Sequence, residues 1–342
     1  MLDIEFIDDV GMFQEFDNME KHLMAMSPDK IETVKKKGLF DKIFGGKFGI
    51  VKSVSELPEN FPITADELKR ITDRIDTATK KPVVLIDIKA KVSDVKSDSS
   101  VLGGFPPYIG EIPVDKNGKQ LRFLIQINCK HLSSLSNFPH DGIIQLWLDR
   151  NCDMANSSCY KVLYFKDTNG ESKIDELDKS VYENGKEWVC IDSNYNDTND
   201  RFLLSFRTGV NYLAPFAWND IDNYDELFAK YWNEIVSDKS KHITADDVYD
   251  LIDKIPETFN AHFGRKNEYD QYGNKLGGYP GFTQSDPRRD DGWTSDNSVL
   301  LLQLDSKGPL MWGDCGSAQV FIKTDDLKNL NFNNVLFDWA CY

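Results

Sequence analysis

The sequence predicts an α+β protein with a large antiparallel β-sheet system and flanking helices, built from two pseudo-symmetric repeat halves. Short apolar runs rich in β-branched and aromatic residues alternate with turn signals over most of the chain. A glycine pair followed by an aromatic residue and proline occurs twice, as Gly103-Gly104-Phe105-Pro106 and Gly277-Gly278-Tyr279-Pro280. Because similar landmarks follow each copy in the same order, we expect two versions of one unit.

Both glycine pairs are predicted to be structural turns. Glycine adopts positive φ without a steric penalty, and a proline biases the residue before it toward extended geometry. Gly103, Gly104, Gly277 and Gly278 are therefore expected to join sheet segments. A phosphate-cradling glycine loop is the alternative, but neither stretch has the Gly-x-Gly-x-x-Gly pattern or the Lys-Ser/Thr ending that such loops use.

Residues 1–60 are predicted to be an N-terminal extension. Apolar residues from Met12 to Met24 recur at helical spacing, which indicates one amphipathic helix that ends before Pro28. The basic segment Lys35–Lys47 follows, and we interpret it as a packed arm or a flexible linker. Contact with a membrane surface is a weaker alternative, because one short stretch without a second anchor gives only marginal binding.

Residues 61–342 are predicted to form the main domain. Thr64 followed by Glu67 is a capping box, so we expect a helix over 65–79. Strand-like runs come next, and a turn signal at Asp115–Lys119 predicts a hairpin between Tyr108-Ile109 and the run at 121–127. These runs span residues 82–88, 121–127, 142–148, 160–165 and 202–206.

The landmarks return in the second half of the chain. A helix with Leu227, Trp232 and Ile235 on one side precedes a second capping-box pattern at 243–255. After the glycine pair, strand-like runs occur at 300–305 and 316–322. Duplication of the segments 63–148 and 243–322 explains this ordered recurrence. Because there are only two copies, each of them long, we expect one pseudo-symmetric body and not a solenoid.

Composition limits the classes of partner. The formal charge of -16 argues against nucleic acid, whose binding depends on lysine and arginine, and favours a basic protein partner. The start of the chain is acidic where a signal peptide is basic, and no apolar run approaches the ~20 residues of a membrane helix. We therefore expect a cytoplasmic protein that binds no nucleic acid or membrane. Its oligomeric state stays open.

The six cysteines are expected to be reduced thiols. They include no Cys-x-x-Cys pair and are scattered, which favours neither a disulfide framework nor a zinc site. The five histidines include no His-Glu-x-x-His pattern, and no Gly-x-Ser-x-Gly elbow is present. We therefore assign no catalytic residue, metal site or cofactor, and the sequence favours a protein that is not an enzyme.

Polar residues set among glycine, proline and tryptophan are the candidate binding residues. They are Gln284, Ser285, Asp286, Arg288, Trp312 and Asp314. Arginine with aromatic and carboxylate neighbours is typical of a recognition site, and equally of a buried structural pair that ties two loops together. We expect Asp286, Arg288, Trp312 and Asp314 to converge, with Arg288 paired to either carboxylate and packed against Trp312.

The motifs of residues 80–342 resemble the YwqG-like family, a set of bacterial cytoplasmic proteins for which no reaction is defined. The matching motifs are the segments 277–280 and 284–288, the run 300–305, Met311-Trp312-Gly313-Asp314-Cys315-Gly316, and Asp338-Trp339-Ala340-Cys341, with looser matches at 103–106, 126–128 and 142–145. The resemblance implies a cytoplasmic α+β protein with a large antiparallel sheet system. It also suggests a role like that of bacterial immunity and interaction modules.

Two functions follow as expectations. The first is a binding module, immunity-like or regulatory, for a basic protein partner. The alternative is a small-ligand-binding protein or an enzyme that uses the loops 284–288 and 312–314. A deep pocket lined by both loops would favour the alternative, whereas a flat acidic face would favour the binding module.

Overall fold

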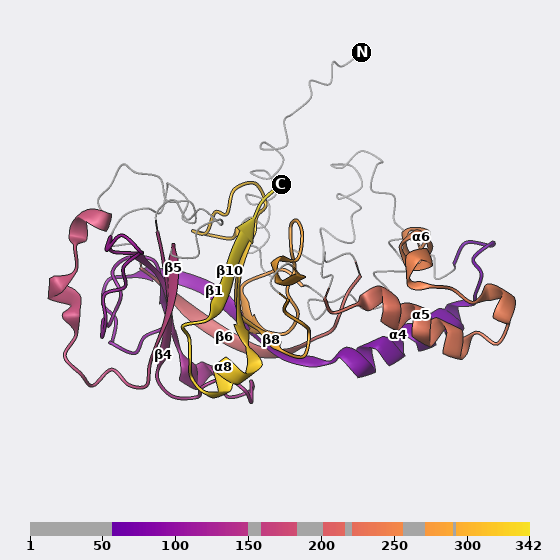
Figure 1. The fold of residues 1–342 in the computed structure, drawn as a ribbon, viewed down its shortest axis with the longest axis horizontal. Helices are drawn as coiled ribbons and strands as arrows, with labels where there is room; N and C mark the ends of the chain where they lie inside the picture. Colours follow the sequence, from indigo (N-terminus) through magenta and orange to yellow (C-terminus); the bar gives the residue numbers. More distant parts are fainter. Residues whose placement is uncertain (1–56, 150–158, 183–200, 216–220, 256–270, 290–291) are drawn as a thin grey trace, which may run out of the picture. The chain divides into compact units, whose positions relative to one another are not determined.

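The computed structural model describes residues 57–149, 159–182, 201–215, 221–255, 271–289 and 292–342. These residues belong to one compact unit, Glu56–Tyr342. The predicted helix and basic segment near the N-terminus lie outside the described residues. The unit combines one antiparallel sheet with a small group of helices (Figure 1), which is the predicted α+β class.

The sheet has ten described strands in the order β10-β9-β8-β7-β1-β6-β2-β3-β4-β5. Their bounds are β1 Lys81–Val92, β2 Val101–Leu102, β3 Arg122–Asn128, β4 Ile143–Leu148, β5 Tyr160–Phe165, β6 Arg201–Asn211, β7 Lys275–Gly277, β8 Ser298–Asp305, β9 Ser317–Lys323 and β10 Val335–Ala340. Each of the longer predicted runs overlaps one of these strands. The prediction succeeds because apolar runs between turn residues are the local signature of a buried strand. The expected hairpin between Tyr108-Ile109 and the run at 121–127 is wrong, because Tyr108 and Ile109 are in no strand and a single bridge joins Val114 to Gln120.

The long strands β1 and β6 form the centre of the sheet and pair with each other over most of their length. β1 has β7 on its other side, and β6 has β2. Each central strand therefore borders the outer strands that lie in the other half of the sequence. Outward from the centre, the order β7-β8-β9-β10 on one side corresponds to β2-β3-β4-β5 on the other.

The sheet curls so that its two edge strands face each other. The hydroxyl of Tyr160 in β5 donates a hydrogen bond to the carbonyl of Val335 in β10 at 3.0 Å. The Tyr160 and Phe337 rings lie 5.2 Å apart between centroids, and Tyr164 stacks on Phe332. Side chains rather than a backbone ladder thus connect the edges.

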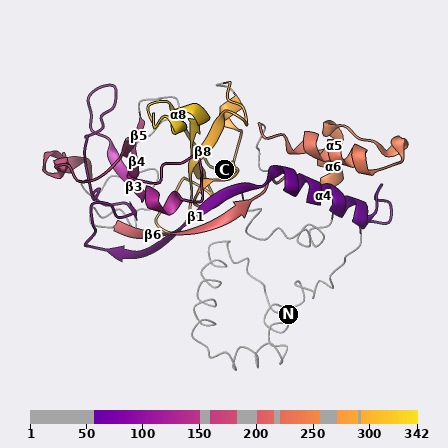
Figure 2. The ribbon, with the colours of Figure 1, turned by 90° about the horizontal axis from the view of Figure 1, so that it is seen from below.

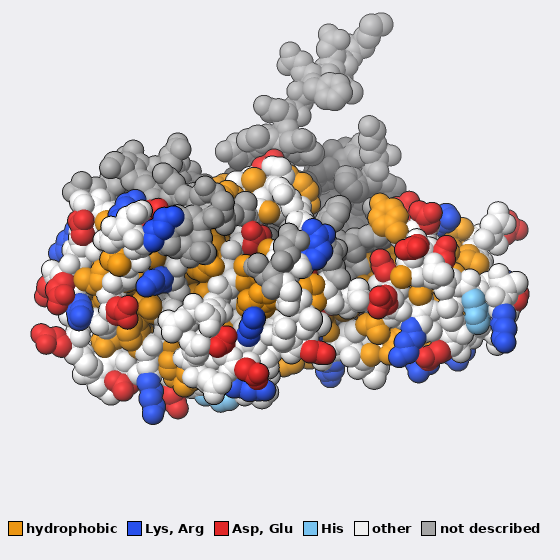
Figure 3. All heavy atoms as spheres, viewed as in Figure 1, with side chains coloured by type: hydrophobic (Ala, Val, Ile, Leu, Met, Phe, Trp, Pro, Cys, Tyr) orange, Lys and Arg blue, Asp and Glu red, His pale blue; other side chains and the backbone are white. Residues whose placement is uncertain are grey.

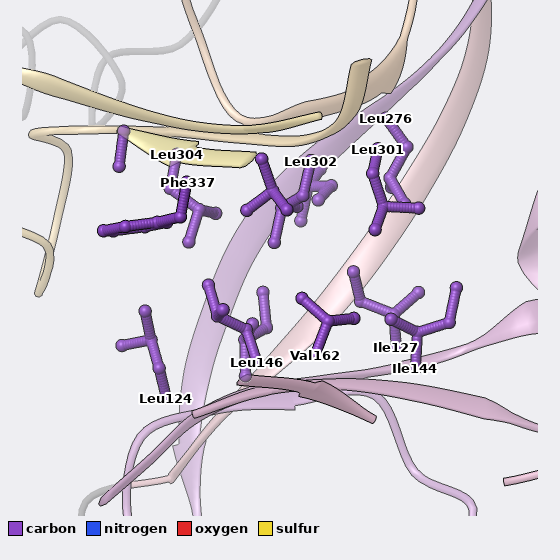
Figure 4. Packing of buried hydrophobic residues seen from close by; sticks show 14 of the residues in the cluster. Leu124, Ile127, Ile144, Leu146, Val162, Leu276, Leu301, Leu302, Leu304 and Phe337 are labelled. Carbon is purple, nitrogen blue, oxygen red and sulfur yellow. The ribbon is translucent and has the colours of Figure 1, made fainter. Parts of the chain in front are cut away.

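The main core fills the inside of this curled sheet. Leu124, Ile144 and Val162 come from one side of the sheet and point toward Leu302 and Phe337 on the other (Figure 4). Because both sides of the sheet contribute to a single apolar cluster, neither half buries its inner face alone.

The helices pack into a separate apolar cluster at one end of the central strands (Figure 2). Their bounds are α4 Ala65–Thr79, α5 Tyr224–Ile235 and α6 Val248–Asp253, while α8 Thr324–Lys328 follows β9. The capping box of Thr64 and Glu67 starts α4 as predicted, and Leu68, Ile71 and Ile75 are its buried face. α4 leads directly into β1, with only Lys80 between them.

The helices do not occupy matching places in the two halves. α4 precedes the central strand β1, whereas α5 and α6 follow the central strand β6. The segments that start at Ile63 and Ile243 were predicted to be equivalent. Their helices, however, have different positions relative to the central strands, so the equivalence does not include the helices. Both capping boxes are present, but they start helices that pack in the same cluster.

Cys159 is disulfide-bonded, so the expectation that all six cysteines are reduced thiols is wrong. Cys129, Cys315 and Cys341 are free. Scattered spacing could not reveal the bond, because only the fold brings cysteines within the ~4.4 to 6.8 Å Cα separation that a disulfide needs. Among the described residues, no helix combines the length and the apolar character that a membrane span requires.

Candidate functional site

The loop between β7 and β8 is anchored by Asp286, Pro287 and Arg288. Pro287 starts a short 3-10 helix, Pro287–Arg289, because its fixed φ suits the first helical position. The Asp286 carboxylate caps this turn by accepting the backbone N–H of Arg288 at 3.0 Å. The same carboxylate receives a forked pair from the guanidinium, at 2.9 Å from Nε and 2.7 Å from Nη2.

A second carboxylate, Asp222, completes the surroundings of Arg288. Nη2 donates to Asp222 Oδ2 at 3.1 Å, and Nη1 donates to the Ser298 hydroxyl at 3.2 Å. The guanidinium carbon lies 4.8 Å from the centroid of the Phe321 ring, and only 3% of the Arg288 side chain is exposed. Burial alone would lower the pKa of Arg288, but the two carboxylates outweigh it and raise the pKa.

Lys81, the first residue of β1, extends this charge network. Its Nζ lies 3.4 Å from Asp222 Oδ1 and 3.8 Å from the centroid of the Tyr279 ring. Burial lowers the pKa of Lys81, and the nearby Asp222 carboxylate opposes that change. Asp222 Oδ1 also accepts the Ser295 hydroxyl at 2.5 Å. We call Lys81, Asp222, Asp286 and Arg288 the ion network.

A cavity of about 350 Å³ adjoins the ion network through Lys81. Gly277, Gly278 and Ser298 form part of its wall. Its other lining residues are Pro82, Leu135, Ser136, Asn137, Phe138, Ser295, Asp296, Val299, Leu300 and Thr324. Half of the lining residues are therefore polar or charged, among them Lys81 and Asp296, and the other half are apolar or glycine. We call it the Lys81 cavity.

Glycine is required where the chain passes this cavity. Gly277 and Gly278 have φ of 69° and 70°, in the left-handed region. A Cβ on Gly278 would lie 2.7 Å from the Asn211 Oδ1 atom, which accepts the N–H of Tyr279 at 2.6 Å. In the first half, Gly103 and Gly104 also have positive φ, of 76° and 64°.

The other predicted site residues lie away from Arg288. Gln284 and Ser285 are exposed, and Gln284 Nε2 donates to the Cys341 carbonyl at 2.6 Å. Asp314 is exposed, and its backbone carbonyl accepts the N–H of Tyr342 at 3.0 Å. The loops 284–288 and 312–314 thus both reach the C-terminal end of the chain.

The predicted convergence around Arg288 holds for Asp286 but not for Trp312. Trp312 is fully buried in the main core, with its ring centroid 6.2 Å from those of Phe337 and Trp339. Phe321 of β9 takes the place over the guanidinium. The reason is strand geometry, because successive side chains point to opposite faces and Phe321 shares the outer face with the β7–β8 loop.

Sequence reasoning did not identify Lys81, Asp222 or Tyr279. Asp222 lies 66 residues before Arg288, so no local pattern joins them. Lys81 carried a weak signal, because it is a cation at the start of a run of apolar strand residues. Among the described residues, no group of three or more His, Cys, Asp or Glu side chains could hold a metal ion.

The fold and the site together define an α+β protein with a ligand-sized cavity beside a buried ion network. The chain belongs to the family of a domain of unknown function, DUF1963, whose model matches residues 100–341. This family is consistent with the resemblance to the YwqG-like proteins. A comparison with curated proteins finds no match. The family match includes Gly277, Gly278 and Arg288, whereas Lys81 lies before it.

Proposed function

We propose that the protein binds a small molecule in the Lys81 cavity. The observation that carries the proposal is a cavity of about 350 Å³ with a lysine ammonium on its wall. Ligand pockets span roughly 300 to 1,000 Å³ and combine apolar walls with a few placed polar groups. The Lys81 cavity has a volume in this range and combines apolar side chains with polar ones and Lys81.

The rigidity of the surrounding groups also supports a binding role. Lys81 is held by Asp222 and by the ring of Tyr279, while Ser298 is held by Arg288. Polar groups that are already positioned lose less entropy when a ligand binds. The ion network therefore has a structural role that also serves the cavity.

A screen with a cavity-filling variant tests this proposal. Ligand-observed NMR with a library of small metabolites should find compounds that bind the wild-type protein. Asn137→Trp, on the cavity wall, should abolish binding, because the indole fills the space. Ser133→Trp is the matched control, since Ser133 is exposed on the same loop but does not line the cavity. Failure of every compound, or binding that Asn137→Trp leaves unchanged, would refute the proposal.

The loops 284–288 and 312–314 receive less support as a ligand site. None of the Lys81 cavity's lining residues belongs to them. The small-ligand function is therefore proposed for the cavity at β1 and β7, and no reaction is proposed for it.

The formal charge of -16 favours a second proposal, association with a basic protein partner in an immunity-like or regulatory role. On the face seen in Figure 3, acidic and basic side chains of the described residues are interspersed. The net charge, rather than an acidic face, thus motivates this proposal. An affinity pull-down from native cytosol should recover a basic protein at low salt and less of it at high salt, whose ions screen charge over ~8 Å at physiological strength. Recovery that is indifferent to salt would refute it.

We also propose that the two halves of the sheet are copies of one unit that exchange their central strands. The palindromic strand order supports this, as do matched glutamine pairs on neighbouring strands. Gln126 lies opposite Gln145, and Gln303 lies opposite Gln319.

Irregularities at matching places add to the support for duplication. The register shifts between Phe123 and Ile125 in one half and between Leu300 and Leu302 in the other. The Nε2 atoms of both inner glutamines donate to two carbonyls each, Gln126 to Ser97 and Ser99 and Gln303 to Gln271 and Gly273. Superposition of segments 101–148 and 275–322 tests the proposal, and unlike Cα paths would refute it.

A further inference from the structure

We infer that the ligand of the Lys81 cavity is a small amphipathic anion, with its anionic oxygens at Lys81 and a short apolar chain against the opposite wall. This inference rests on the proposed binding function and names the ligand class. The juxtaposition of one cation with an apolar wall in the same cavity motivates it.

The coordination of Lys81 leaves a place for an anionic oxygen. An ammonium has three N–H donors. The Asp222 carboxylate and the Tyr279 ring face the ammonium, at 3.4 Å and 3.8 Å. The side chain keeps 37% of its surface exposed, and Lys81 lines the cavity. A ligand oxygen can therefore accept from the remaining direction.

Asp222 is not a dedicated partner of Lys81. Its Oδ2 atom accepts from Arg288 at 3.1 Å, and its Oδ1 atom accepts from Ser295 at 2.5 Å. Both contacts are shorter than the 3.4 Å separation from Lys81. Because the carboxylate is already satisfied by these donors, the ammonium of Lys81 is only partly neutralised. An anionic ligand would neutralise the rest of the positive charge of the Lys81 ammonium.

A second donor lies on the same wall. The Ser298 hydroxyl oxygen accepts a hydrogen bond from Arg288 Nη1, so its own hydrogen points elsewhere. Ser298 lines the same cavity as Lys81, so its hydroxyl is a second group from which a polar atom of the ligand can accept a hydrogen bond. Asp296 also lines the cavity, but it is exposed, so that water screens its charge.

The remaining wall suits a short hydrocarbon chain. The apolar lining residues are Pro82, Leu135, Phe138, Val299 and Leu300. Leu135 and Phe138 come from the segment after β3, whereas Val299 and Leu300 lie near the start of β8. A short hydrocarbon chain against these side chains would leave water, which favours binding.

Three probes with one chain and different head groups test the inference, namely hexanoate, 1-hexanol and hexylamine. Heteronuclear NMR titration of the full chain should show hexanoate binding about tenfold more tightly than 1-hexanol, the effect of one charge-assisted hydrogen bond of about 1.4 kcal/mol. Hexylamine should not bind measurably, because its charge repels that of Lys81.

Two lysine variants localise the preference. Lys81→Met should abolish the advantage of hexanoate over 1-hexanol while leaving 1-hexanol binding unchanged. Lys80→Met is the matched control, because Lys80 is the preceding residue, is exposed and does not line the cavity. If Lys81→Met does not fold, the three-probe comparison on the wild-type protein still decides the charge preference.

The outcomes separate this inference from the function on which it rests. Binding of 1-hexanol or hexylamine as tight as that of hexanoate, sensitive to Asn137→Trp, would overturn the anion preference and leave the cavity as a binding site. A preference for hexanoate that survives in Lys81→Met would also overturn it. If none of the probes binds and the metabolite screen also finds no ligand, the proposed function fails with it.

Discussion

Replacing Arg288 with alanine should destabilise the protein strongly while leaving its surface charge pattern nearly unchanged. The side chain is 3% exposed, and the Asp286 and Asp222 carboxylates that it neutralises are 0% and 2% exposed. Without the guanidinium, both carboxylates stay buried and lose the charge-assisted hydrogen bonds that Arg288 donates to them. Removing one partner of a buried ion pair costs about 3 to 5 kcal/mol, because the other charge is left uncompensated.

The exposed pair of Arg207 and Asp87 provides a matched control. Arg207 also makes a forked contact, with Nε 2.9 Å and Nη2 3.3 Å from the two oxygens of Asp87. Its side chain is 60% exposed, so Arg207→Ala should cost only about 0 to 1 kcal/mol. Both variants remove an arginine that makes a forked contact with an aspartate, but only Arg288 is buried and also bonded to Asp222 and Ser298.

Urea unfolding followed by tryptophan fluorescence measures both effects. The midpoint should fall far more for Arg288→Ala than for Arg207→Ala, with similar slopes. Equal losses in the two variants would show that burial of the Arg288 pair has no energetic consequence and would refute the reasoning.

The pH dependence of Arg288→Ala gives a second check. A buried carboxylate without its cation has a raised pKa, above the ~3.9 of an unfolded aspartate. The folded variant therefore binds a proton that its unfolded chain does not, and its stability increases as the pH falls through the raised pKa. The decrease in the free energy of unfolding of Arg288→Ala relative to wild type should thus be smaller at pH 5 than at pH 7.5. A loss that grows toward acid would contradict this account.

Three further predictions concern other parts of the molecule. Gly118→Ala, with φ of 81° and no atom within 4 Å of the added Cβ, should cost about 1 to 2 kcal/mol in unfolding experiments. Gly278→Ala should cost at least about 1 kcal/mol more, because its Cβ also displaces the Asn211 amide from its hydrogen bond, and equal costs would argue against this close approach. Burial raises the pKa of Asp338 to about 6, so protonation of this carboxyl should add stability as the pH falls from 7 toward 4. Asp338→Asn should raise stability at pH 7 by about 1 to 3 kcal/mol and remove that gain, and an unchanged pH profile would exclude Asp338 as its source. Deleting residues 1–55 should leave one cooperative thermal transition in calorimetry, and loss of that transition would show that these residues complete the core.

Local chemistry explains which elements could be predicted from the sequence. The capping box of Thr64 and Glu67 satisfies the first N–H groups of α4 within three residues, so the start of the helix is encoded locally. The strands were recognisable because buried β-strands are continuous apolar runs bounded by turn residues. The turn chemistry of the glycine pairs was equally local, since only glycine adopts their φ without strain.

Contacts between distant segments explain what could not be predicted. Asp286 was predicted as a partner of Arg288 because it is close in sequence. Asp222 was missed because it is far from Arg288 in sequence. Trp312 was expected at the site because of its neighbours in sequence, but the loop between β8 and β9 carries it into the main core. The Lys81 cavity brings together the ends of β1 and β7 with the segment after β3, which no spacing in the chain reveals.

The sequence by itself therefore determined the helices, the strands, the glycine turns and the acidic character of the protein, because each depends on residues close together in the chain. The tertiary structure decided the order of the strands in the sheet, the burial of the ion network and the position of Lys81 on a cavity wall. These features depend on which strands become neighbours in the sheet, and that pairing is selected by burial of one shared core rather than by any local pattern.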